Sequence, residues 1–198
     1  MACNAGGVRA VRYGVVRNYV RGIEVVLATG EILTLGGKLL KDVAGYDLMD
    51  LIIGSQGTLG VITKVVIRLY PKFTETATLI IPYEGRHDAI RTVPRILREG
   101  MIPLAIEYVE NELMEKSAKQ LGKEWPVKMG KAALMIIVTG NSQEEVYLEA
   151  ERIDKVAREY GAIDTLVVEN RRKQDDILSI RSNIYFILKP YIMDALDV

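Results

Sequence analysis

The sequence predicts an α+β protein with two parts that meet near residue 72. Residues 1–70 combine glycine-rich turns with short runs of β-branched side chains, a pattern typical of a small sheet. Beyond Pro71, strand-like runs alternate with segments of helical periodicity. A chain of 198 residues is long enough for one large domain or two small ones, and the change of pattern favours two.

The segment after Pro71 has the strand and helix order of a ferredoxin-like α/β sandwich with one added helix. Strands are expected at residues 76–82, 104–109, 132–139 and 163–168. Helices are expected at residues 86–98, 111–121 and 142–160, because each has an apolar face and is followed by a glycine. Two strand-helix-strand units predict one sheet covered by helices.

Several helices of this segment begin at residues that favour N-caps. Ser142 and Glu145 form a capping box, and Asn111 and Asn170 are expected to cap the helices that follow them. The helix over residues 86–98 is expected to bury the apolar face formed by Ala89, Ile90, Val93, Ile96 and Leu97.

The first part is expected to contain a hairpin, a short helix and a third strand. Residues 19–35 form the hairpin, and residues 61–67 form a β-branched strand. Between them, Asp47 caps a short helix that ends at Gly54. The expected apolar face of that helix consists of Leu48, Leu51 and Ile52.

The most informative stretch is residues 54–63, where three glycines stand at a spacing of three. Such a turn exposes backbone N–H groups, which suit an anionic or polar cofactor. It is neither a Walker loop nor the dinucleotide fingerprint, because the residues that define those motifs are missing. A glycine-rich hairpin that binds nothing explains the spacing equally well. The cluster at residues 4–7 is a turn that could direct N–H groups in the same way.

Composition excludes several functional classes. The net charge is zero and the isoelectric point is near 6.6, so no basic field attracts nucleic acid or an anionic membrane. No apolar run is long enough to predict a transmembrane segment. With one cysteine, Cys3, and one histidine, His87, neither a disulfide framework nor the usual zinc site can form. We expect a reducing compartment, the cytoplasm.

Five motifs occur here in a characteristic order: Asn4-Ala5-Gly6-Gly7, Arg12-Tyr13-Gly14, the Thr29-Gly30-Glu31 turn, residues 41–48 and residues 54–63. Together they resemble the FAD-linked oxidases of the vanillyl-alcohol-oxidase type, and among these the glycolate oxidase large subunit and FAD-dependent D-lactate dehydrogenases. Gln56 stands where that family usually has Glu, and Cys3 where it usually has Thr, Ala or Asn. Neither difference removes a backbone donor.

The resemblance implies FAD as cofactor and a PCMH-type FAD-binding subdomain. Residues 1–72 would be the second part of the FAD-binding domain, and residues 73–198 a cap or substrate domain, incomplete at its C-terminus. We expect a fragment that binds FAD weakly by itself, because the family's pyrophosphate loop and histidine-rich segment are absent. The implied FAD contacts are Cys3, Asn4, Ala5, Gly6, Gly7, Gln56, Gly57, Thr58, Leu59, Gly60, Val61 and Ile62.

Arg181 is the candidate substrate-binding residue. It falls on the apolar stripe of the last helix, formed by Ile177, Ile180, Ile184 and Leu188. In the family, an arginine in a Trp-x-x-Arg motif binds the substrate carboxylate, and here Leu178 replaces the tryptophan. An arginine that merely extends from the edge of the stripe into solvent is the alternative.

The implied activity is oxidation of a D-2-hydroxy acid of the glycolate or D-lactate type. The alternative is a non-catalytic remnant or an assembly module that needs a partner chain. We also expect a homo-oligomer or a complementing chain, because a segment as short as residues 1–70 cannot cover all its apolar strand residues. Those residues are Val25, Leu27, Ile32, Val61, Ile62, Val65 and Ile67.

Overall fold

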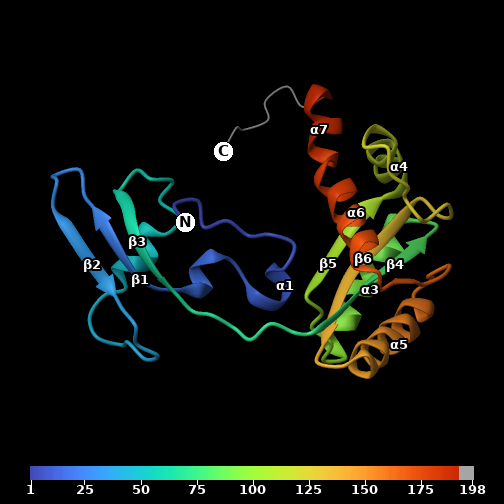
Figure 1. Cartoon of the computed structure of the whole chain (residues 1–198), viewed down its shortest axis with the longest axis horizontal. Coiled ribbons are helices and arrows are strands. Elements are labelled where there is room, and N and C mark those ends of the chain that lie inside the picture. Colours follow the sequence, from blue (N-terminus) through green and yellow to red (C-terminus); the bar gives the residue numbers. More distant parts are fainter. Residues whose placement is uncertain (192–198) are drawn as a thin grey trace. The chain divides into compact units, whose positions relative to one another are not determined.

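The computed structural model describes residues 1–191 and divides the chain into two compact units (Figure 1). Unit 1 comprises Met1–Lys72, and unit 2 begins at Phe73. Each unit has its own sheet, and buried apolar side chains form one cluster in unit 1 and two in unit 2.

Unit 1 is a three-stranded antiparallel sheet with the order β2-β1-β3. Val25 of the central strand pairs with Leu33 on one side and Ile62 on the other, and it is fully buried. Val20 and Ile23 of the same strand, together with Ile52 and Ile53, complete the buried cluster of unit 1. The elements are α1 (Ala10–Tyr13), η1 (Val16–Tyr19), β1 (Val20–Val26), β2 (Ile32–Gly36), α2 (Leu48–Ile52) and β3 (Val61–Ile67).

Helix α2 begins as expected, because the Asp47 carboxylate accepts a hydrogen bond from the Asp50 N–H at 3.0 Å. The predicted apolar face is wrong in part: Leu48 and Leu51 are 45% and 61% exposed, and only Ile52 is buried. The helix has five residues, barely more than one turn, so only its C-terminal end reaches the sheet.

Unit 2 is a four-stranded antiparallel sheet with the order β5-β6-β4-β7. This is the ferredoxin-like order, with α4 added between the second and third strands, and it confirms the predicted fold class. The elements are β4 (Glu75–Tyr83), α3 (Arg86–Arg98), β5 (Ala105–Glu110), α4 (Asn111–Gln120), β6 (Ala132–Gly140), α5 (Gln143–Glu159), β7 (Leu166–Val168), α6 (Arg171–Ser182), α7 (Ile184–Leu188) and η2 (Lys189–Tyr191).

Helices cover both faces of this sheet (Figure 1). Leu79 and Ile81 of β4 face the cluster that contains α3 and α5, whereas Ile80 between them faces the cluster of α4 and α6. Since successive strand residues point to opposite faces, a strand buried on both sides is mostly apolar at successive positions. The apolar run at residues 132–138 of β6 has the same cause.

Helix α3 spans the predicted residues but turns a slightly different face inward. Ile90 and Leu97 are 52% and 38% exposed, while Thr92 is fully buried. The Thr92 hydroxyl accepts a hydrogen bond from the Tyr83 hydroxyl at 3.0 Å and donates to the Asp88 carbonyl at 2.8 Å. The Thr92 hydroxyl makes its hydrogen bonds within the protein. A threonine can therefore occupy a buried position, although the apolar pattern predicted other residues of this helix to be buried.

Two further details differ from prediction. Asn111 does not cap α4: it is the first helical residue, and its amide group donates to the carbonyls of Met129 and Gly130 at 2.9 and 3.0 Å. Strand β7 is shorter than residues 163–168, because only Leu166–Val168 pair with β4 in register. The caps at Ser142 and Asn170 form as expected.

Candidate functional site

The two glycine-rich runs assigned to FAD lie against each other in unit 1. The Gln56 N–H donates to the Ala2 carbonyl at 2.9 Å, and the Arg17 N–H donates to the Asn4 side-chain oxygen at 3.0 Å. The Arg17 guanidinium in turn donates to the carbonyls of Asp50 and Ile53 at 3.1 and 2.8 Å. Arg17 therefore ties the N-terminal turn to the end of α2.

Both runs adopt backbone conformations that L-residues seldom take. Among residues 1–191, Asn4 and Gln56 are the non-glycine residues with positive φ, at 47° and 57°. Gly57 follows Gln56 at φ 77°, so the turn has two successive left-handed residues. Such strain is characteristic of turns that hold a ligand, although a structural turn can also contain it.

The glycines of these runs have different roles. A side-chain carbon added at Gly7 or Gly57 would meet no protein atom within 4 Å, so the backbone is open on that side. At Gly60 it would lie 2.7 Å from the Val25 side chain and 2.8 Å from the Val26 carbonyl. Gly60 is therefore required by close packing of β3 on β1, whereas Gly7 and Gly57 leave space for another molecule.

Most side chains of the two runs are accessible. Cys3, Gln56 and Thr58 are exposed, and Leu59 and Val61 are 42% and 67% exposed. Ile62 instead packs against the core of unit 1, so only its backbone is available. The arrangement combines open backbone with exposed apolar side chains, which suits a ligand with both polar and planar apolar parts.

In unit 2, the Arg181 guanidinium contacts the Glu107 carboxylate at two points. Arg181 Nη2 lies 2.5 Å from Glu107 Oε1, and Nε lies 2.5 Å from Oε2. The Glu107 side chain is 12% exposed and that of Arg181 is 40% exposed. Burial raises the pKa of Glu107, and the positive charge and hydrogen bond of Arg181 partly offset this shift.

Glu107 was not predicted from the sequence as a site residue. The available signal was its position: it is the charged residue within the strand sequence Ala-Ile-Glu-Tyr-Val, where an unpaired carboxylate would be costly. Its partner lies 74 positions further along the chain, so only the fold brings the two together.

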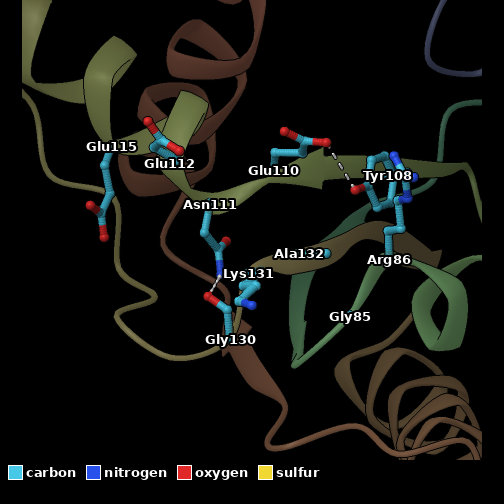
Figure 2. Close-up of a pocket in the computed structure, with 10 residues that line it drawn as sticks. All are labelled: Gly85, Arg86, Tyr108, Glu110, Asn111, Glu112, Glu115, Gly130, Lys131 and Ala132. Carbon is cyan, nitrogen blue, oxygen red and sulfur yellow. Dashed lines mark hydrogen bonds between the residues drawn. The ribbon is translucent and has the colours of Figure 1, made fainter.

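A pocket of about 530 Å³ opens near the starts of α3 and α4 (Figure 2). It is lined by Gly85, Arg86, Tyr108, Glu110, Asn111, Glu112, Glu115, Gly130, Lys131 and Ala132. The Tyr108 hydroxyl donates to the Glu110 carboxylate at 3.3 Å across one side of it. None of the residues that the resemblance assigns to FAD or substrate lines this pocket, and it contains charges of both signs.

Comparison with known proteins identifies the family. The profile of the C-terminal domain of FAD linked oxidases matches residues 73–195. The chain belongs to the FAD linked oxidases. FAD is the cofactor of this family, as the motifs of unit 1 predicted.

Two curated relatives illustrate the range of the family. The chain is 40% identical to a D-lactate dehydrogenase of Archaeoglobus fulgidus, over all of this chain and 43% of that protein. It is 36% identical to the glycolate oxidase subunit GlcD of Bacillus subtilis, over 86% of this chain and 36% of that protein. The chain thus spans less than half the length of the curated relatives it matches.

A solved structure of alkyldihydroxyacetonephosphate synthase has a similar fold, with a TM-score of 0.66 at 18% identity. The match covers 95% of this chain and 35% of that structure. In the part of the chain that the structure describes, no helix is long and apolar enough to cross a membrane.

The geometry of unit 1 fits the family's cofactor. FAD has a charged pyrophosphate and two planar ring systems, and it needs close backbone approach together with apolar contact. The space beside Gly7 and Gly57 permits the approach, and Leu59 and Val61 are exposed apolar side chains in the same run. Of the twelve predicted contact residues, Gly60 and Ile62 also have a structural role in the sheet.

Proposed function

We propose that this chain is part of an FAD-dependent oxidoreductase that oxidises a D-2-hydroxy acid of the glycolate or D-lactate type. The observation that carries the proposal is the similarity to a D-lactate dehydrogenase at 40% identity over the whole chain. Further support comes from the open backbone of the two glycine-rich runs and from an accessible arginine in unit 2.

In this proposal, residues 1–72 are the second part of the FAD-binding domain, and residues 73–198 are the cap or substrate domain. Residues 3–7 and 56–62 hold FAD, mainly through backbone atoms. When bound, FAD accepts the hydride equivalent that leaves the hydroxyl-bearing carbon of the substrate. The exposed side chains of Leu59 and Val61 provide apolar contact and displace water from that part of the cofactor.

Arg181 is the proposed partner of the substrate carboxylate. A guanidinium can bind a carboxylate through two parallel hydrogen bonds, which fixes the orientation of the acid as well as its position. We propose that the base for the hydroxyl proton comes from outside this chain. The one histidine, His87, is exposed in the first turn of α3.

The proposed setting is the cytoplasm, with a further polypeptide covering unit 1. The further polypeptide is proposed because apolar strand residues of unit 1 are exposed: Ile32, Val61 and Ile67 are 65%, 67% and 54% exposed. Val25 is an exception to the expectation, because the sheet of unit 1 buries it completely. Either a second copy of this chain or a complementing chain would cover these residues.

A chimeric enzyme tests the proposed function. The segment of the Archaeoglobus fulgidus D-lactate dehydrogenase that aligns with this chain is replaced by the present sequence, and D-lactate-dependent flavin reduction is measured. We expect activity, and Arg181→Lys should raise KM for D-lactate by about tenfold or more. Arg172→Lys, at an exposed position on the same helix, is the matched control and should change nothing.

The alternative of a non-catalytic module makes the opposite prediction. A chimera that folds and contains FAD, yet reduces no flavin with D-lactate or glycolate, would contradict the proposed activity. Equal activity in the Arg181 and Arg172 variants would remove Arg181 from the substrate site while leaving the activity intact.

A further inference from the structure

The contact between Glu107 and Arg181 has a geometry that leaves part of the guanidinium free. Glu107 Oε1 accepts a hydrogen bond from Nη2 at 2.5 Å, and Oε2 forms an ion pair with Nε at 2.5 Å, so the carboxylate lies on the Nε and Nη2 side of the guanidinium. An arginine has five N–H groups in one plane, and two of them, on Nε and Nη2, face Glu107. The other three lie on the edge formed by Nη1 and the outer side of Nη2, where a second carboxylate can bind.

Arg181 is more exposed than Glu107, and this is the difference that binding of a second carboxylate to Arg181 would need. Glu107 is the covered partner, at 12% exposure, and Arg181 is the accessible one, at 40%. Glu107 lies on a strand within the sheet of unit 2, whereas Arg181 is in the last turn of α6. A carboxylate fixed on a rigid strand can therefore hold a long, flexible side chain in one orientation.

An ion pair whose only role is stability would be expected at a more exposed position. A desolvated carboxylate paired with one cation gains little stability, because the cost of removing it from water offsets the attraction. The same helix has another ion pair, between Lys123 and Asp176 at 2.8 Å, in which Asp176 is 41% exposed. A covered glutamate on a strand is thus an unusual partner for an arginine whose role is stability alone.

We infer that Glu107 is a positioning residue: it fixes the Arg181 guanidinium side-on, so that the Nη1 and Nη2 edge is presented to the substrate carboxylate. The inference rests on the proposed function, in which Arg181 binds a 2-hydroxy acid. Glu107 touches no substrate itself. It makes the arginine rigid before the acid arrives, so that less side-chain freedom is lost on binding.

Nuclear magnetic resonance of the arginine side chains in the full chain tests this inference. In the wild type, Glu107 should slow rotation of the Arg181 guanidinium about the Nε–Cζ bond, which separates its Nη signals. D-lactate should then shift the Arg181 signals in a saturable titration. The neutral analogue D-lactamide serves as the negative probe.

Three variants separate the outcomes. Glu107→Gln should free the rotation and weaken D-lactate binding by about tenfold, since an amide has one acceptor oxygen where the carboxylate has two. Glu107→Asp, which keeps both oxygens, should restore part of each effect. Asp176→Asn removes the neighbouring ion pair on α6 and should alter neither. The fluorescence of Trp125, the single tryptophan, checks that unit 2 of each variant is folded.

The results distinguish this inference from the proposed function. If wild-type Arg181 does not respond to D-lactate, both the carboxylate role of Arg181 and the inference are wrong. If the wild type responds and Glu107→Gln binds D-lactate equally well, the function stands and the positioning role is wrong. Tighter binding by Glu107→Gln would show that Glu107 competes with the substrate, which also contradicts a positioning role.

Discussion

Glu107 of β5 lies against Arg181 of α6, with both carboxylate oxygens 2.5 Å from guanidinium nitrogens. The pKa of Glu107 is raised above its ordinary value of 4.5, because burial outweighs the opposing effect of Arg181. A carboxyl group with a raised pKa in the folded state makes the protein less stable as it ionises. The contribution of Glu107 is therefore complete below pH 4.5 and is lost as the pH rises through its folded pKa.

The raised pKa of Glu107 gives the first prediction. The free energy of unfolding of the wild type minus that of Glu107→Gln should fall as the pH rises from about 4 upward. Urea unfolding followed by Trp125 fluorescence measures it, since Trp125 is buried in unit 2. A difference that increases with pH over the same interval would show that the attraction of Arg181 outweighs desolvation.

Asn111 gives a prediction for the stability of unit 2. Its side chain donates to two carbonyls and accepts a hydrogen bond from the Trp125 indole N–H at 3.2 Å, and it is 5% exposed. Asn111→Ala should cost about 2–3 kcal/mol, because the buried partners lose their hydrogen bonds. Asn170→Ala, which removes only the cap of α6, should cost about 1 kcal/mol. Equal losses of stability in the two variants would mean that the hydrogen bonds of Asn111 contribute no more than a helix cap does.

The case of Asn111 shows where sequence reasoning stops. An asparagine before a helical pattern predicts a cap, and the helix does begin there. The actual partners, Met129, Gly130 and Trp125, lie in a loop whose path no local pattern specifies. Apolar patterning, by contrast, predicted the ferredoxin-like fold correctly, since strands buried on both faces are mostly apolar at successive positions.

The candidate site also has a part that the local sequence predicts and a part that depends on the fold. The motifs in residues 4–7 and 54–63 are local, so the sequence alone predicts both runs as FAD contacts. Their packing through Arg17 and the separate role of Gly60 depend on contacts between distant residues. Glu107 could not be found as a partner of Arg181 for the same reason, because its local sequence is that of an ordinary strand.

Gly60 provides a test of the proposed two-domain division. Gly60→Ala places a carbon 2.7 Å from Val25, in the centre of the unit 1 sheet, and should loosen that sheet. Hydrogen exchange should become faster in β1 and β3, while the Trp125 unfolding midpoint of unit 2 stays within error of the wild type. Gly85→Ala, where the added carbon meets no atom within 4 Å, is the control. A parallel shift of the Trp125 midpoint would show that the two units unfold together.

The exposed strand residues of unit 1 predict self-association of the isolated chain. Burying apolar area stabilises by about 25 cal/mol per Å², and Ile67 is 54% exposed on β3. Ile67→Glu should shift the chain toward monomer in sedimentation experiments at low micromolar concentration. Leu148→Glu, at an equally exposed position on α5 of unit 2, should leave the distribution unchanged. A monomeric wild type would contradict the proposed partner surface.

FAD titration of the purified chain tests the central claim, that the two glycine-rich runs of unit 1 form part of the FAD site. Gly57→Ala and Gly30→Ala make a matched pair, because both glycines have positive φ, at 77° and 85°, and open space around them. The two variants should lose similar backbone stability, about 1 kcal/mol each. We predict weak but saturable FAD binding by the wild type and by Gly30→Ala, and about tenfold weaker binding by Gly57→Ala. Equal affinity in all three proteins would contradict the claim.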